Sequence, residues 1–157
     1  MKLDVVSLDD KLVPFVNAVY EQNREILHGP VININEWHES LFGKEADPYE
    51  VSFIVMTDGK PAAWLKMNGM NNDKICISML VVDDAYKRSG VGSFTVRFAE
   101  DLAKAHAKTA VRIQTTKDNI PATQCYLKQG YIAKEIVYAV GDGINRDGYE
   151  FTKEIKY

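Results

Sequence analysis

One short stretch of the sequence combines basic side chains with closely spaced glycines. It runs from Tyr86 to Ser93 (YKRSGVGS), between an apolar run, Ile75 to Val82, and an amphipathic run, Val91 to Ala107. These runs predict a strand that leads into a helix, whose first turn offers unpaired N–H groups and the positive end of the helix dipole. Gly90 and Gly92 let an anion approach the backbone closely. The stretch is typical of a phosphate or pyrophosphate site, although the glycines could equally serve only to shape a tight turn.

Two further segments complete a recognisable pattern. Met79-Leu80-Val81-Val82 precedes the turn, and Asn119-Ile120-Pro121-Ala122 follows it, leading to Tyr126-Leu127-Lys128-Gln129-Gly130-Tyr131. Together the three segments resemble the GCN5-related N-acetyltransferase (GNAT) superfamily, with its hydrophobic strand, R/Q-x-x-G-x-G/A loop and N-x-x-A-x-x-x-Y-x-x-x-G-F/Y signature. Lys87 stands where that family has Arg or Gln, which leaves a phosphate site built from backbone groups intact. The sequence lacks the GxGxxG and GxxxxGK[ST] signatures of Rossmann and P-loop proteins.

The resemblance implies an acetyl-CoA-dependent N-acetyltransferase in which an amine attacks the thioester directly within a ternary complex. Backbone groups of the loop would hold the pyrophosphate, and backbone groups of the preceding strand would stabilise the oxyanion and pair with the pantetheine arm. Without the resemblance, that strand is simply a core strand. No metal is expected. The implied cofactor-binding residues are Leu80, Val81, Val82, Lys87, Arg88, Ser89, Gly90, Val91, Gly92, Ser93 and Asn119.

Tyr126 occupies the position where members of the resembled family place a tyrosine general acid. A phenol can donate a proton to an emerging thiolate, an effect worth roughly 100- to 10,000-fold in rate for a positioned acid. An aromatic residue on a helix face is otherwise most often a core residue. Asn119 would bind the cofactor or fix the loop, although it could equally be a plain helix cap.

The sequence does not identify a general base. The strand from Lys74 to Val82 offers Cys76 and Ser78 but no acid, and Asp73 lies at its outer end. Other candidates on the substrate side are Glu21, Glu25, Glu50 and His28, each of which could be simply a solvated residue. His38 and His106 are expected at the surface.

The resemblance implies that the acceptor enters opposite the cofactor, over the first two helices and the loop before the last strands. Aromatic and acidic residues there would suit a cationic amine: Tyr20, Glu21, Glu25, His28, Trp37 and the segment from Tyr138 to Tyr149. The same residues could equally pack the helices. The acceptor could be a small amine, an amino-acid or antibiotic amine, or a protein amine. The alternative function is a non-catalytic acyl-CoA-binding or sensing module, and a homodimer through the C-terminal strands is possible.

Composition places the chain among ordinary globular proteins. It has 157 residues, 46% of them hydrophobic and 26% charged, which is enough for a single domain with its own core. The formal net charge of −3 argues against a nucleic-acid partner. No run is long enough for a membrane span, and the acidic N-terminus does not resemble a signal peptide. Cys76 and Cys125 are too far apart for a CxxC pair, so we expect reduced thiols and a cytoplasmic location.

Periodicity predicts a mixed, mostly antiparallel sheet flanked by helices. By the resemblance, its fourth and fifth strands are parallel and splayed. Asn35 is expected to cap the second helix, and Asp58-Gly59 to form a hairpin turn. The expected strands span 3–8, 51–57, 62–68, 74–82, 110–116, 131–140 and 149–155. The expected helices span 9–27, 36–42, 91–107 and 121–129.

Overall fold

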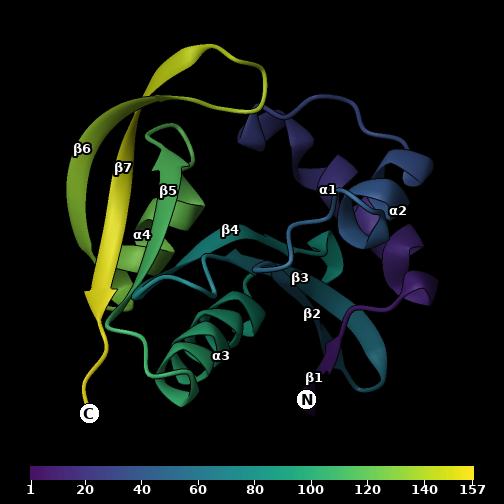
Figure 1. The fold of residues 1–157 in the computed structure, drawn as a ribbon, viewed down its shortest axis with the longest axis horizontal. Helices are drawn as coiled ribbons and strands as arrows, with labels where there is room; N and C mark the ends of the chain where they lie inside the picture. Colours follow the sequence, from purple (N-terminus) through teal and green to yellow (C-terminus); the bar gives the residue numbers. More distant parts are fainter.

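The computed structural model describes residues 1–157 and contains one seven-stranded sheet with helices on both faces (Figure 1). The strand order is β1-β2-β3-β4-β5-β7-β6, and only β4 and β5 run parallel to each other. The strands are β1 (Leu3–Ser7), β2 (Val51–Thr57), β3 (Lys60–Asn68), β4 (Lys74–Val82), β5 (Ala110–Thr116), β6 (Ile132–Ala139) and β7 (Asn145–Glu154). The α-helices are α1 (Val13–Leu27), α2 (Ile34–Phe42), α3 (Val91–Ala105) and α4 (Ile120–Lys128), and the 3₁₀ turns are η1 (Asp10–Leu12) and η2 (Asp84–Tyr86). The predicted mixed architecture is confirmed.

Alternation along the central strands divides the core between the two faces of the sheet. Leu65 of β3 packs in one cluster with Ile77 of β4 and with residues of α3 and α4. Trp64, the neighbour of Leu65, faces the opposite way and packs with residues of α1 and α2. The buried positions of α3 recur at helical spacing: Val91, Thr95, Val96, Ala99 and Ala103. Helices α1 and α2 therefore cover one face, and α3 and α4 the other.

The centre of the sheet is split. β4 pairs with β5 only from Lys74↔Ala110 to Ile77↔Ile113, although both strands continue beyond that point. The split begins next to a bulge, because Lys66 of β3 lies opposite Met79 and Met67 opposite Ile77, which leaves Ser78 as the extra residue of β4. The Ser78 hydroxyl donates to the Lys66 carbonyl at 3.1 Å. The predicted splay of the parallel pair is thus confirmed.

Several boundaries differ from the prediction, among them the starts of α2 and β7. The cap of α2 is Asn33 and not Asn35: the Asn33 side chain accepts from the Glu36 N–H at 2.8 Å, while the Glu36 carboxylate accepts from the Asn33 N–H. β7 begins at Asn145, four residues before the predicted start, because the polar segment 145–148 pairs with β6 through its backbone. None of the helices is long and apolar enough to cross a membrane.

Candidate active site

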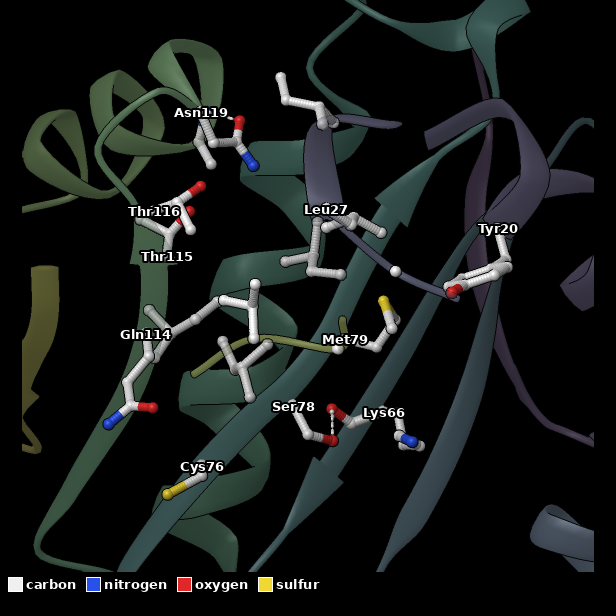
Figure 2. A pocket seen from close by; sticks show the side chains of 18 of the residues that line it. Tyr20, Leu27, Lys66, Cys76, Ser78, Met79, Gln114, Thr115, Thr116 and Asn119 are labelled. Carbon is white, nitrogen blue, oxygen red and sulfur yellow. Dashed lines mark hydrogen bonds between the residues drawn. The ribbon is translucent and has the colours of Figure 1, made fainter. Parts of the chain in front are cut away.

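A cavity of about 760 Å³ lies over the split, between the connection from α1 to α2 and strands β3, β4, β5 and β7. Figure 2 shows Gln114, Thr115 and Thr116 of β5 on one side of it, and Tyr20 and Met79 on the other. Among the residues singled out in the sequence, those that line the cavity are Tyr20, Trp37, Cys76, Ser78, Met79, Leu80, Asn119, Ala122, Tyr126 and Tyr138, together with Val140 and Gly141 of the segment 138–149. The residues of the glycine loop do not line it.

The end of β4 presents unpaired backbone groups to the split. The Asp83 N–H donates to the Ala62 carbonyl at 2.8 Å, and the alternation of an antiparallel ladder therefore turns the backbone groups of Val81 toward β3. Leu80 and Val82 turn theirs away from β3, toward the side where β5 has already diverged. The side chain of Val81 lies in the core under α1, whereas Leu80 lines the cavity. The N–H groups of Leu80 and Val82 are therefore free where the oxyanion site was expected, whereas the Val82 carbonyl accepts from the Asn23 side-chain amide at 3.4 Å.

The loop after β4 has the backbone of an anion site. The six N–H groups from Arg88 to Ser93 donate no hydrogen bond within the chain, and the last three form the first turn of α3. Gly90 has a φ of 87°, and a Cβ added there would meet nothing within 4 Å. A Cβ on Gly92 would meet only Val82, at 3.8 Å. The open space above six unpaired donors fits the pyrophosphate of a CoA thioester.

The side chains of this loop contribute less charge than their types suggest. Lys87 lies 2.7 Å from the Asp84 carboxylate, so its charge is paired. Ser89 donates its hydroxyl to the Tyr86 carbonyl. Arg88 has no ion-pair partner in the chain and is exposed, which leaves it as the free cation at the loop. An anion held here would rely mainly on the backbone.

Tyr126 is both a core residue and a cavity residue. Its ring is 3% exposed and lies 5.7 Å from the ring centroid of Tyr131 and 5.4 Å from that of Phe151. Its side chain also lines the cavity. Burial, followed by the nearby Cys125, raises the pKa of Tyr126 well above the ordinary 10.0, so the hydroxyl stays protonated at neutral pH. A protonated phenol in this place can donate a proton.

Asn119 has the capping contact that a purely structural role requires. Its Oδ1 accepts from the Ala122 N–H at 3.3 Å, at the start of α4. It also lines the cavity, and Figure 2 shows its side chain on the same side as Thr115 and Thr116. The cap leaves the side-chain amide N–H groups free for a ligand, and the cofactor contact stays a prediction.

Most acidic candidates for the base lie away from the cavity. Glu21 pairs with Arg24 at 3.1 Å, and neither Glu25 nor Asp73 lines the cavity. Glu50 lies in an adjoining acidic hollow, 3.8 Å from Lys66; burial raises the pKa of Glu50, and Lys66 opposes that rise. His28 contacts Asp118 at 2.7 Å and does not line the cavity.

The polar residues of the cavity that were not singled out from the sequence are Ser40, Lys66, Asn68, Arg112, Gln114, Thr115, Thr116 and Glu150. Lys66, Arg112 and Glu150 are the charged residues of its lining. A signal for two of them exists in the strand AVRIQTT, where Arg112 and Gln114 alternate with buried Val111 and Ile113. A charged face on a central strand is unusual and indicates a solvent-filled site.

The mouth of the cavity is bordered by two loops in close contact. A Cβ added to Gly141, in the loop between β6 and β7, would lie 3.0 Å from Pro30 and 3.2 Å from Gly29, in the loop between α1 and α2. Figure 1 shows these two loops approaching each other at the top of the molecule. All three residues line the cavity, so the contact borders it.

Comparison with known proteins agrees with this geometry. The family model described as "Acetyltransferase (GNAT) family" matches residues 14–131. A ribosomal-protein-S18-alanine N-acetyltransferase from Escherichia coli has a similar structure, with a TM-score of 0.75 at 16% identity over 99% of this chain and 96% of that one. A spermidine N-acetyltransferase from Vibrio cholerae in complex with CoA and spermine gives a TM-score of 0.82 at 14% identity, over 98% and 95%.

One curated relative is similar in sequence. Streptothricin acetyltransferase from Escherichia coli is 24% identical over 87 residues, which make up 55% of this chain and 50% of that protein. The family model covers all three motifs from which the resemblance was inferred, from Met79 to Tyr131. The chain therefore belongs to the acetyltransferase (GNAT) family.

Proposed function

We propose that this protein transfers an acetyl group from acetyl-CoA to an amine, by direct attack within a ternary complex. The observation that carries the proposal is the row of six unpaired N–H groups from Arg88 to Ser93, placed where β4 leaves the split. The relatives support the same reaction class, because their names describe N-acetyl transfer to spermidine and to a ribosomal protein.

Backbone groups of β4 at the split would stabilise the charge that develops during the reaction. Acetyl-CoA would supply an activated acetyl thioester. The N–H groups of Leu80 and Val82 would stabilise the negative charge that develops on the carbonyl oxygen when the amine attacks, and one such donor is worth about 100- to 1,000-fold in rate. The C–N bond forms as the C–S bond breaks, and the reaction with an ammonium substrate releases the CoA thiol and one proton.

Tyr126 would protonate the departing thiolate. A phenol with a raised pKa is a weak acid, but the same apolar surroundings would also raise the pKa of a thiol formed beside it. Proton transfer from the Tyr126 hydroxyl to the CoA thiolate therefore stays feasible. The raised pKa also keeps the hydroxyl protonated before the thiolate forms. As an acid, Tyr126 needs a proton on its hydroxyl and a fixed position. Packing against Tyr131 and Phe151 fixes the position of its ring.

The test is Tyr126→Phe. We expect kcat, measured as CoA release with a panel of amines, to fall about 100-fold or more, while the acetyl-CoA affinity measured by calorimetry stays nearly unchanged. Tyr131→Phe is the matched control, because Tyr131 belongs to the same aromatic cluster, donates to Glu100 at 2.9 Å and does not line the cavity. Equal turnover in Tyr126→Phe and wild type would remove Tyr126 as the acid. Acetyl-CoA binding without turnover of any amine would favour the acyl-CoA-binding module.

A further inference from the structure

The floor of the cavity is a polar part of the sheet, on the face where α1 and α2 lie and opposite the buried Val111 and Ile113. Register places Asn68, Cys76 and Arg112 in one row across β3, β4 and β5. Gln114 and Glu150 form a second row across β5 and β7, two residues further along β5 and so about 7 Å away. All five residues line the cavity.

Arg112 is not neutralised by any carboxylate of the chain within ion-pair distance. Its recorded side-chain bond is a 3.5 Å contact from Nη2 to the Cys76 sulfur. Its Nε is buried and has no hydrogen-bond partner. A guanidinium presents its donors as a planar fork that matches a carboxylate or phosphate, and a buried donor without a partner is costly. Both facts point to an oxyanion as the missing partner.

Glu150 carries the opposite charge on the same floor without pairing to Arg112. Its Oε2 accepts from the Gln114 side-chain amide at 3.3 Å, and it forms no ion pair. It is the only carboxylate that lines the cavity. A cation and an anion held apart in one cavity are complementary to a ligand with both charges.

The second cation of the cavity disfavours a ligand with several positive charges. Lys66 lies 3.8 Å from Glu50, at the outer limit of an ion pair, and its ammonium lies 5.7 Å from the Trp64 ring. The lining therefore holds two cations and one anion. Like charges at an interface cost several kcal/mol, so a polyamine fits the part of the lining around Arg112 poorly; the carboxylates of the adjoining acidic hollow border Lys66 and not Arg112.

From these contacts we infer that the acceptor is a small zwitterionic amine, such as an amino acid, whose oxyanion binds Arg112 and whose ammonium group lies at Glu150. This inference rests on the proposed function. It narrows the acceptors that the sequence left open, among which an amino-acid amine was one, because the acidic candidates Glu21 and Glu25 do not line the cavity.

The experiment compares matched pairs of amines: amino acids and the amines that remain when their carboxylate is removed, with spermidine as a third arm. We expect wild-type kcat/KM to favour at least one amino acid over its decarboxylated amine by roughly 10- to 100-fold, the effect of a charge-assisted bidentate contact. Arg112→Met should reduce this ratio to about one, and Arg112→Lys should retain part of it. A folding defect would lower both rates and leave the ratio unchanged.

Arg97→Met is the control, since Arg97 is exposed on α3, on the opposite face of the sheet, and should leave the ratio unchanged. Acetylation of amines with no preference for the carboxylate, or a preference for spermidine, overturns this inference and leaves the proposed function standing. Amino-acid binding that depends on Arg112, seen by calorimetry without any turnover, overturns the proposed function and supports the site. An amino-acid preference that survives in Arg112→Met overturns the role of Arg112.

Discussion

Under the proposed function, single residues of the glycine loop would act mainly through their backbone. Lys87 is paired with Asp84 and Ser89 with Tyr86, whereas the six N–H groups from Arg88 onward have no partner. Gly90 sits among these donors with a φ of 87°, a conformation that a residue with a side chain adopts only with strain. The loop therefore tolerates Lys87 in place of the family's Arg or Gln, but should not tolerate a side chain with negative charge.

Gly90→Glu tests this loop. We expect acetyl-CoA binding, measured by calorimetry, to weaken at least about 100-fold, because a carboxylate would lie among the phosphate donors. Gly59→Glu is the control: Gly59 has a φ of 80°, also has nothing within 4 Å of an added Cβ, and lies in the turn between β2 and β3. It should cost similar stability and leave binding unchanged. Undiminished binding in Gly90→Glu would show that the pyrophosphate lies elsewhere.

At this scale the sequence indicated the candidates that lie in contiguous motifs and missed the cavity residues that come from distant strands. The loop, Asn119 and Tyr126 belong to contiguous motifs, so the resemblance to the family could indicate them from the sequence. Arg112 and Glu150 become neighbours only through the order in which β5 and β7 pair. Periodicity within one strand does not specify which polar residues of other strands will line the same cavity, because that depends on how the strands pair.

The bounds of individual helices and strands were predictable where a single sequence pattern marks both ends of the element. The bounds of β2, β4 and β5 match the sequence prediction, because these strands are apolar or strictly alternating and end at turn residues. The cap of α2 was misplaced by two residues, since Asn33 and Asn35 are equally good caps by type and only the reciprocal contact with Glu36 distinguishes them. The start of β7 was missed because backbone pairing needs no apolar side chain.

The capping box of α2 can be tested directly. Asn33→Ala should lower the free energy of unfolding by about 1 kcal/mol, because it removes the acceptor for the Glu36 N–H. Asn35→Ala should change it by less than about 0.5 kcal/mol, as Asn35 lies inside the helix and makes no capping bond. Urea titration of both variants measures the difference. An equal loss of unfolding free energy in the two variants would contradict Asn33 as the cap of α2.

At the scale of the whole molecule, a polar contact at the surface joins the two sides of the cavity. His28, at the end of α1, contacts Asp118, which precedes α4, at 2.7 Å. A hydrogen bond from Thr116, and secondarily His28, holds the pKa of Asp118 below its ordinary 3.8. A lowered folded-state pKa means that the carboxylate stabilises the fold above about pH 3.8, and that this contribution disappears as the pH falls through the folded-state pKa.

Asp118→Asn should therefore lower Tm at pH 7 and have no effect once Asp118 is protonated in the folded wild type as well. The carboxylate is 58% exposed, so the loss at pH 7 should be only about 0.5 kcal/mol, or roughly 1–2 °C. Thermal unfolding followed by circular dichroism at several pH values measures it. Asp101→Asn, an exposed residue of α3 without an ion pair, should show no difference at any pH. A loss for Asp118→Asn that persists below the folded-state pKa would contradict the assignment to the charge.

The short ladder between β4 and β5 has a consequence for how the stability of the protein depends on bound ligand. Four register pairs, from Lys74↔Ala110 to Ile77↔Ile113, join the two halves of the sheet, and beyond them both the ladder and the packing are interrupted by the cavity. A ligand that fills this seam and binds only the folded chain adds stability in proportion to the logarithm of its concentration over Kd. Under the proposed function, each turnover would empty the seam and loosen the protein. Its resistance to unfolding and proteolysis would then follow the supply of acetyl-CoA.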